Sequence, residues 1–174
     1  MTLTSFIGSQ RNLLEETPEH CRMIKYLHPV FLNSDVEKLR KYNNPDFRAE
    51  TVSMIFPVSQ GEDGLEKALD RLCDEAERRV DSGFSVLILS DRGADADNAP
   101  IPSLLACSAV HHHLIRVKKR TRVGIVVETA EAREVMHIAL LFGYGANAVN
   151  PYGALATIRH LYYGGALMQG LNFP

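Results

Sequence analysis

The sequence lacks long apolar runs, closely spaced cysteines and an excess of charge of either sign. No stretch reaches the ~18 consecutive apolar residues that a membrane helix needs, and no charged-then-apolar signal segment opens the chain. Three cysteines (Cys21, Cys73 and Cys107) lie far apart without a CxxC pair, which predicts reduced thiols in a cytoplasmic protein. The formal net charge of −2 gives no broad basic surface, so we expect no nucleic-acid or membrane partner.

Motifs for nucleotide and calcium binding are also absent. Neither GxGxxG nor GxxxxGK(S/T) occurs, and the Gly143-Tyr144-Gly145 turn is typical of a helix stop. The acidic segment 91–101 fails as a calcium loop, because a loop starting at Asp95 loses its ligand pattern after Asp97. We therefore predict a solvated turn in which Asn98 or Pro100 helps to start the next helix.

Three consecutive histidines, 111–113, invite a metal interpretation that helix geometry disfavours. Successive residues on a helix point ~100° apart, so three neighbours do not converge on one ion. Helical zinc pairs stand four positions apart, where His112 and His113 meet Arg116 and Val117. We expect no metal here; one histidine should hydrogen-bond near the sheet, and another should face solvent or a neighbouring domain.

What the sequence does contain, after residue 48, is a regular alternation of strands and helices. Apolar runs predict strands over 50–56, 84–89, 122–128 and 146–150. Apolar residues at helical spacing, or the intervening sequence, predict four helices, marked by Leu65, Ala68, Leu69, Leu72, Cys73, Ala76 and Val80; by the segment 102–117; by Ala132, Val135, Met136, Ala139 and Leu140; and by Tyr152, Leu155, Ile158 and Tyr162. This βαβαβαβα order predicts an α/β fold with a four-stranded parallel sheet, resembling a truncated barrel because four strands cannot close an eight-stranded one.

The first 48 residues differ in character and read as an arm packed on the sheet domain of residues 49–174. One helix is expected near Pro18–Lys25 and another over Asp35–Tyr42, capped by Asn33 or Ser34. With 174 residues, the arm and the sheet together should form one structural domain.

Polar residues follow three of the predicted strands. Asp91 and Arg92 follow the second, Glu128 ends the third, and Asn150 and Tyr152 come at or just after the fourth. Parallel strands bring these residues to one carboxyl edge, where ligand sites of such sheets lie. No Cys or Lys nucleophile stands beside them, so we favour a structural Arg92–Glu128 pair over a ligand site.

At this point long motifs establish a resemblance. The segments RNLLEETPEHCRMI, LILSDRGADADNAPIPSLLACSAVHHHLI and RTRVGIVVETAEAREVMHIALLFGYGANAVNPY look like the central domain of the glutamate synthase large chain, from about Gly8 to Ile158. Two positions depart from that family: Gln10 stands where proline or glutamate is usual, and Ala156 where an acidic residue often follows.

The resemblance implies a part of an enzyme of glutamate biosynthesis and ammonia assimilation. In that family an amidotransferase domain releases ammonia from glutamine, and an FMN-binding domain with an iron–sulfur cluster uses it to make glutamate. The central domain joins the two and walls the ammonia tunnel. We expect no cofactor in this chain, no activity from the chain alone, and domain-interface or structural roles for the edge residues Asp91, Arg92, His112, Glu128, Arg133, Asn150 and Tyr152.

Two alternatives from other classes stay open. The chain could be a small ligand- or anion-binding α/β module that uses the edge residues 91, 92, 128 and 150. It could also be an oligomerisation module, in which case a large apolar face would be buried only in a dimer.

Overall fold

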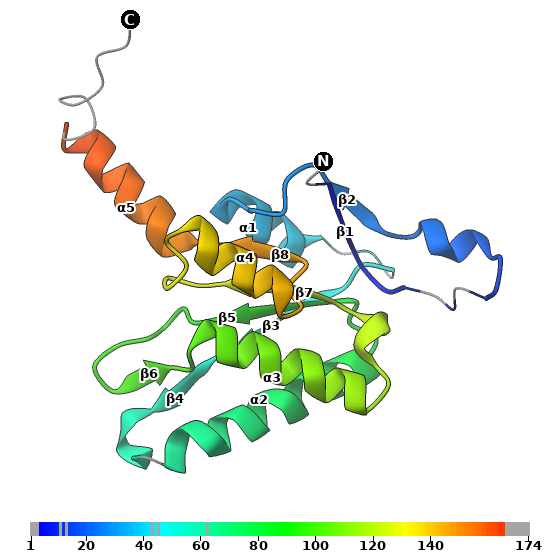
Figure 1. The fold of residues 1–174 in the computed structure, drawn as a ribbon, viewed down its shortest axis with the longest axis horizontal. Helices are drawn as coiled ribbons and strands as arrows, with labels where there is room; N and C mark the ends of the chain where they lie inside the picture. Colours follow the sequence, from blue (N-terminus) through cyan, green and yellow to red (C-terminus); the bar gives the residue numbers. More distant parts are fainter. Residues whose placement is uncertain are drawn as a thin grey trace, which may run out of the picture.

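A four-stranded parallel sheet forms the centre of the molecule (Figure 1). The computed structural model describes residues 4–10, 12, 14–42, 44, 46–61 and 63–165. The sheet has the order β3-β5-β7-β8, built from Ala49–Ser53, Val86–Ser90, Gly124–Glu128 and Ala148–Asn150. Each strand lies beside its predecessor in this series and the outer two do not pair, which confirms the predicted open, truncated-barrel sheet.

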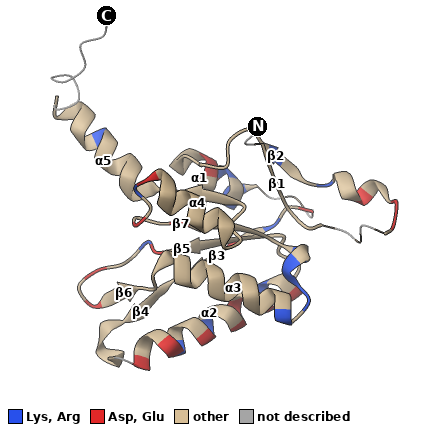
Figure 2. Ribbon diagram, viewed as in Figure 1, with Lys and Arg blue, Asp and Glu red and all other residues tan. Residues whose placement is uncertain are grey.

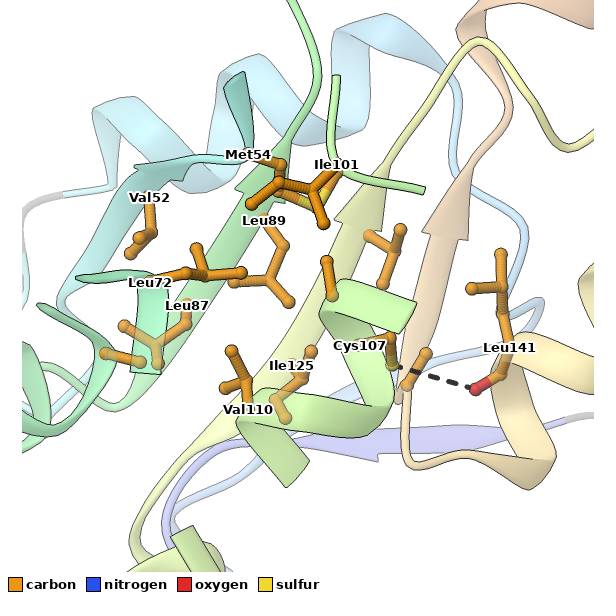
Figure 3. Close-up of a cluster of buried hydrophobic side chains, with 14 of the residues drawn as sticks. Val52, Met54, Leu72, Leu87, Leu89, Ile101, Cys107, Val110, Ile125 and Leu141 are labelled. Carbon is orange, nitrogen blue, oxygen red and sulfur yellow. Dashed lines mark hydrogen bonds between the residues drawn. The ribbon is translucent and has the colours of Figure 1, made fainter. Parts of the chain in front are cut away.

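Three helices and their apolar side chains cover one face of this sheet. They are α2 (Asp63–Asp81), α3 (Ser103–Arg116) and α4 (Val135–Gly143). Figure 3 shows their contribution to the main core, where helix residues meet the inward side chains of the strands; the labelled members are Val52, Met54, Leu72, Leu87, Leu89, Ile101, Cys107, Val110, Ile125 and Leu141. Burial on both faces explains why β5 and β7 are continuous apolar runs.

The amino-terminal arm covers the opposite face. Its hairpin, β1 (Ser5–Ile7) with β2 (Ile24–Tyr26), and helix α1 (Asn33–Lys41) form a second core; the buried members are Ile7, Phe31, Val36, Leu39, Val86, Ile88, Val126 and Ala148. The arm also closes the sheet edge, because Val30 bridges Val149 in parallel fashion.

Two expectations for the arm are wrong in detail. Residues 18–25 do not form one helix: a short 3-10 turn, Pro18–Cys21, gives way to strand β2, because β1 supplies its backbone partners. Neither Asn33 nor Ser34 caps α1, since both lie inside it. The Asp35 carboxylate instead accepts from the backbone N–H of Leu32 at 3.0 Å.

The predicted strand 50–56 is in fact two strands. β3 ends at Ser53, and β4 (Ile55–Pro57) pairs antiparallel with β6 (Asn98–Pro100). Residues 98–100 therefore form a strand rather than helping to start α3. The buried Met54 separates the two strands, donating to Ser90 and accepting from Ile101.

The last two helices form, but α4 begins only at Val135, after Ala132 of the predicted stripe, and both bury less than the spacing suggested. α4 buries Leu141, whereas Val135 and Met136 of the predicted stripe are 85% and 63% exposed. Helix α5 (Tyr152–Tyr163) extends away from the sheet in Figure 1 and, in the described structure, buries none of its side chains. Two 3-10 turns, Val58–Gln60 and Arg120–Arg122, complete the fold.

Candidate functional site

The carboxyl edge of the sheet brings the predicted polar residues together. Ser90, Glu128 and Asn150 end three neighbouring strands and lie side by side in the strand register. All three are buried, as is Asp91, which follows β5. The edge is therefore a packed layer of polar groups.

Glu128 is the centre of this layer, with only 1% of its surface exposed. Arg92 donates Nε to Oε1 at 2.6 Å, so the structure contains the predicted Arg92–Glu128 pair. From the other face, Arg40 of α1 donates Nη2 to Oε2 at 2.6 Å and Nη1 to Oε1 at 3.4 Å. The Ser90 hydroxyl adds a bond to Oε2 at 2.6 Å. Both oxygens of this carboxylate are thus engaged by groups of the same chain.

These contacts keep Glu128 ionised inside the protein. Burial alone would raise the pKa of its carboxyl, but hydrogen bonds from Arg40, Ser90 and Arg92 outweigh that effect and lower the pKa below its ordinary value. Burial likewise opposes the charge of Arg40, and hydrogen bonds to Glu128 and Glu37 nevertheless raise its pKa. A carboxylate so held does not take up a proton at neutral pH, which disfavours a role as general acid.

Asp91 forms a second, adjoining group of contacts. Its oxygens accept from the Thr129 hydroxyl at 2.6 Å, from the backbone N–H of Ala130 at 2.9 Å and from the Tyr152 hydroxyl at 2.6 Å. The guanidinium of Arg92 stacks on the Tyr152 ring, 3.9 Å from its centroid. Burial and the Asp91 carboxylate raise the pKa of Tyr152 well above its ordinary value, so the phenol stays a donor.

Asn150 links the edge to the amino-terminal arm. Its Nδ2 donates to the Phe31 carbonyl at 2.8 Å and to Asn33 Oδ1 at 3.0 Å. Its Oδ1 is the one buried side-chain polar atom that lacks a hydrogen-bond partner within the described part of the chain. Such an atom costs free energy, and the two bonds of the same amide offset that cost.

The other two candidates lie apart from this edge network. His112 is exposed on α3, and its hydrogen bond within the described ranges is to its own helix, with Nδ1 2.9 Å from the Ser108 carbonyl. Arg133 is also exposed and donates Nη1 to Thr157 of α5 at 3.2 Å. An interface role for either residue stays a prediction.

At the opposite edge a half-buried arginine makes contacts that the sequence did not predict. Arg120 donates to His111 Nδ1 at 2.9 Å, to the Val123 carbonyl at 2.6 Å and to the Gly145 carbonyl at 2.7 Å. Gly145 has φ +107°, and a side chain there would collide with His111. Burial, then the charge of Arg120, lowers the pKa of His111. The signal available in the sequence was the Gly143-Tyr144-Gly145 turn, which needs a glycine for close approach as well as for its helix stop.

The histidines and cysteines do not assemble a metal centre among the residues described. His111 accepts from Arg120, whereas His113 lies 2.7 Å from Glu77 of α2, so the three imidazoles have separate surroundings. Within these residues, no group of three or more His, Cys, Asp or Glu side chains is placed to hold an ion. All three cysteines are free; Cys21 is exposed and the other two are buried. No helix in the described ranges is long and apolar enough to span a bilayer.

The fold and the edge geometry define a class: an open parallel α/β domain in which the usual ligand edge is filled by its own side chains. The match to known families identifies the group within this class. Residues 1–172 match the glutamate synthase central domain, and the chain belongs to that family.

Relatives with different electron donors share the similarity. The chain is 36% identical to the NADH glutamate synthase of Schizosaccharomyces pombe over 99% of its length, and 41% identical to the large chain of the NADPH enzyme of Bacillus subtilis over 89%. It is 40% identical to the chloroplastic ferredoxin-dependent glutamate synthase of Spinacia oleracea over 91%. The chain spans only 8–10% of the length of these relatives, which are therefore much larger polypeptides.

Proposed function

We propose that this chain is the non-catalytic central domain of a glutamate synthase, acting in glutamate biosynthesis and ammonia assimilation. In this role it connects a glutamine amidotransferase domain with an FMN-binding synthase domain and walls the path that ammonia takes between them. Membership of the central-domain family supports the proposal. So does the small share of each relative that the chain spans, since the remaining length must fold into other domains.

The observation that carries the non-catalytic part is the saturation of the carboxyl edge. Parallel α/β sheets bind ligands there, because loops and strand ends converge on that side. Here each oxygen of Asp91 and Glu128 accepts at least one bond from the chain itself. Carboxylates held in this way orient loops and α5, and they have no oxygen left over for a metal or a substrate proton.

The iron–sulfur cluster of the parent enzyme does not fit the cysteines of this chain. An iron–sulfur cluster is held by converging cysteine thiolates. Cys21 is exposed on the arm, whereas Cys73 and Cys107 are buried on different helices. Burial raises the pKa of Cys107 to about 11, which disfavours the thiolate that a metal requires. We therefore assign the cluster to another domain of the polypeptide, and the FMN belongs to the synthase domain proposed above.

The proposal is tested by comparing two activities of a complete glutamate synthase polypeptide that carries this segment. Glu128→Ala should loosen the central domain, and it should reduce glutamine-dependent glutamate formation more than formation from added ammonia. A matched substitution far from the edge, Lys67→Ala on the exposed side of α2, should change neither. Equal losses with both nitrogen sources would contradict a role in channelling ammonia.

The isolated chain provides a second test. It should neither hydrolyse glutamine nor form glutamate from ammonia, 2-oxoglutarate and a reductant. Turnover above background, or saturable binding of phosphate or flavin that Arg92→Ala abolishes, would favour the small ligand-binding module instead.

A further inference from the structure

Helix α5 is an amphipathic helix whose apolar side remains uncovered. It has 12 residues, and in the described structure none of them is buried. Ile158 is 55% and Tyr162 56% exposed. A helix of this length is marginal in water by itself and normally depends on a packed face for stability.

The apolar residues of α5 form a stripe along one side of the helix, half-buried at Ala154 and Leu155 and exposed at Ile158, Leu161 and Tyr162. Residues at helical spacing share a face; in α5 this face holds Ala154, Leu155, Ile158, Leu161 and Tyr162. The only Lys, Arg, Asp or Glu on the helix is Arg159, and Figure 2 shows a single blue segment along α5. The low charge excludes a phosphate backbone or an acidic surface as the natural partner of this side.

The base of α5, in contrast, is firmly held by the carboxyl edge. The Tyr152 hydroxyl bonds Asp91, and Arg92 stacks on the Tyr152 ring. Gly153 packs so closely that a Cβ there would lie 2.6 Å from the Ala130 carbonyl oxygen. The direction of the helix is therefore set by its first turn while its stripe faces outward.

We propose that the α5 stripe is the docking surface for another segment of the same polypeptide, and that the edge network serves to fix the angle of α5 for it. This inference rests on the proposed function. The partner surface is apolar, the back of a helix or a sheet face, because the stripe offers aliphatic and aromatic side chains with almost no charge.

The small area of the stripe favours a tethered partner over a second copy of the chain. A helix of 12 residues is about 18 Å long and about 10 Å wide, so its stripe offers a few hundred Å² at most. A stable dimer needs roughly 600–1,000 Å² from each partner. A covalently linked segment acts at an effective concentration in the millimolar range, so a smaller surface is enough. Relatives about nine to twelve times longer than this chain supply ample polypeptide for that role.

The test compares two variants of α5 in two settings. Ile158→Asp with Leu161→Asp places charge on the stripe, and Ala156→Asp with His160→Asp places the same charge on the opposite side of the helix. In the isolated chain, both variants should remain monomeric by light scattering and leave the amides of 154–163 poorly protected from hydrogen exchange.

In a complete glutamate synthase polypeptide carrying the segment, the same amides should become at least tenfold better protected. The stripe variant should lose that protection and the control should keep it. Equal exposure of the α5 amides in both settings would overturn the proposal. So would a finding that the isolated chain forms a dimer and that only the stripe substitutions convert it to a monomer. Hydrogen exchange does not depend on activity, so its outcome is independent of the ammonia-channelling test.

Discussion

Helices α2 and α5 have the same kind of apolar repeat but differ in the burial of their apolar side chains. Both repeat apolar residues at helical spacing, but the 19-residue α2 buries Leu72, Ala76 and Val80 against the sheet, whereas α5 buries nothing in the described structure. The two helices are placed differently relative to the sheet: α2 packs along its face, and α5 extends away from its carboxyl edge. Periodicity thus identifies the apolar side of a helix. Which surface packs against that side depends on how the chain places the helix relative to the sheet.

The largest expected effect is the difference in the free energy of unfolding between truncating the apolar side of α2 and truncating that of α5. Leu72→Ala leaves a cavity in the main core and should lower the free energy of unfolding by about 2–5 kcal/mol. Ile158→Ala, its counterpart on α5, should change it by less than about 0.5 kcal/mol, because the side chain is already in water. Urea denaturation of both variants checks this, and similar losses would show that α5 is covered within the chain.

The next effect concerns the edge that holds α5. Arg92→Ala removes one donor from the buried Glu128 and should cost about 1–3 kcal/mol, more than the ~1 kcal/mol of an exposed ion pair. Arg40 remains as a partner, which places the loss toward the lower end. Arg92→Ala combined with Glu128→Gln should cost less than the two single losses together, as measured in a double-mutant cycle. Strict additivity would mean that the two residues do not interact.

A smaller loss should follow from releasing the first turn of α5. Tyr152→Phe keeps the ring under Arg92 but removes the bond to Asp91, which retains Thr129 and Ala130 as donors. We expect a loss of about 0.5–1.5 kcal/mol. Amide exchange in 154–163 should rise while that of α2 stays unchanged; a uniform rise across both helices would argue against a local anchor.

The smallest effect is a pH dependence of the free energy of unfolding that arises from His111 of α3. His111 accepts a bond from Arg120, and its pKa in the folded state is lowered from 6.5. The unfolded chain therefore binds a proton more readily than the folded one. The contribution of neutral His111 to the free energy of unfolding is fully present above about pH 6.5 and is lost as the pH falls below that value. Denaturant midpoints between pH 8 and 5 should show the decline. His111→Gln should flatten it, His160→Gln on α5 should not, and a decline unchanged in the first variant would exclude His111 as its source.

Local pattern was sufficient for the framework of the fold. The apolar runs that became β5 and β7, and the stripe of α2, carry strong signals because both faces or one whole side are buried. The pairing of β4 with β6 and of β1 with β2 was missed, because three-residue strands are stabilised by a partner distant in sequence. Single-sequence periodicity contains no information about that partner.

Members of the edge site were predictable only where they end a strand or directly follow one. Arg92 follows β5 and Glu128 ends the neighbouring parallel strand β7, so their contact could be expected from the topology. Arg40 reaches the same carboxylate from α1 on the far face, and nothing in its local sequence indicates that path. Arg120 and His111 meet for a similar reason, through a turn that brings the start of β7 back to α3.

The closure of the sheet edge by the arm has a consequence for synthesis on the ribosome. The Phe31 carbonyl binds Asn150, 119 positions later, and the bridge of Val30 to Val149 has a comparable span. At roughly 5–20 residues per second, the arm emerges about 6–24 s before the strand that it must meet. Within this domain, the arm is therefore made before the sheet but is among the last segments to reach its final place. The β8 edge can pair with other chains only between its own emergence and the docking of the arm.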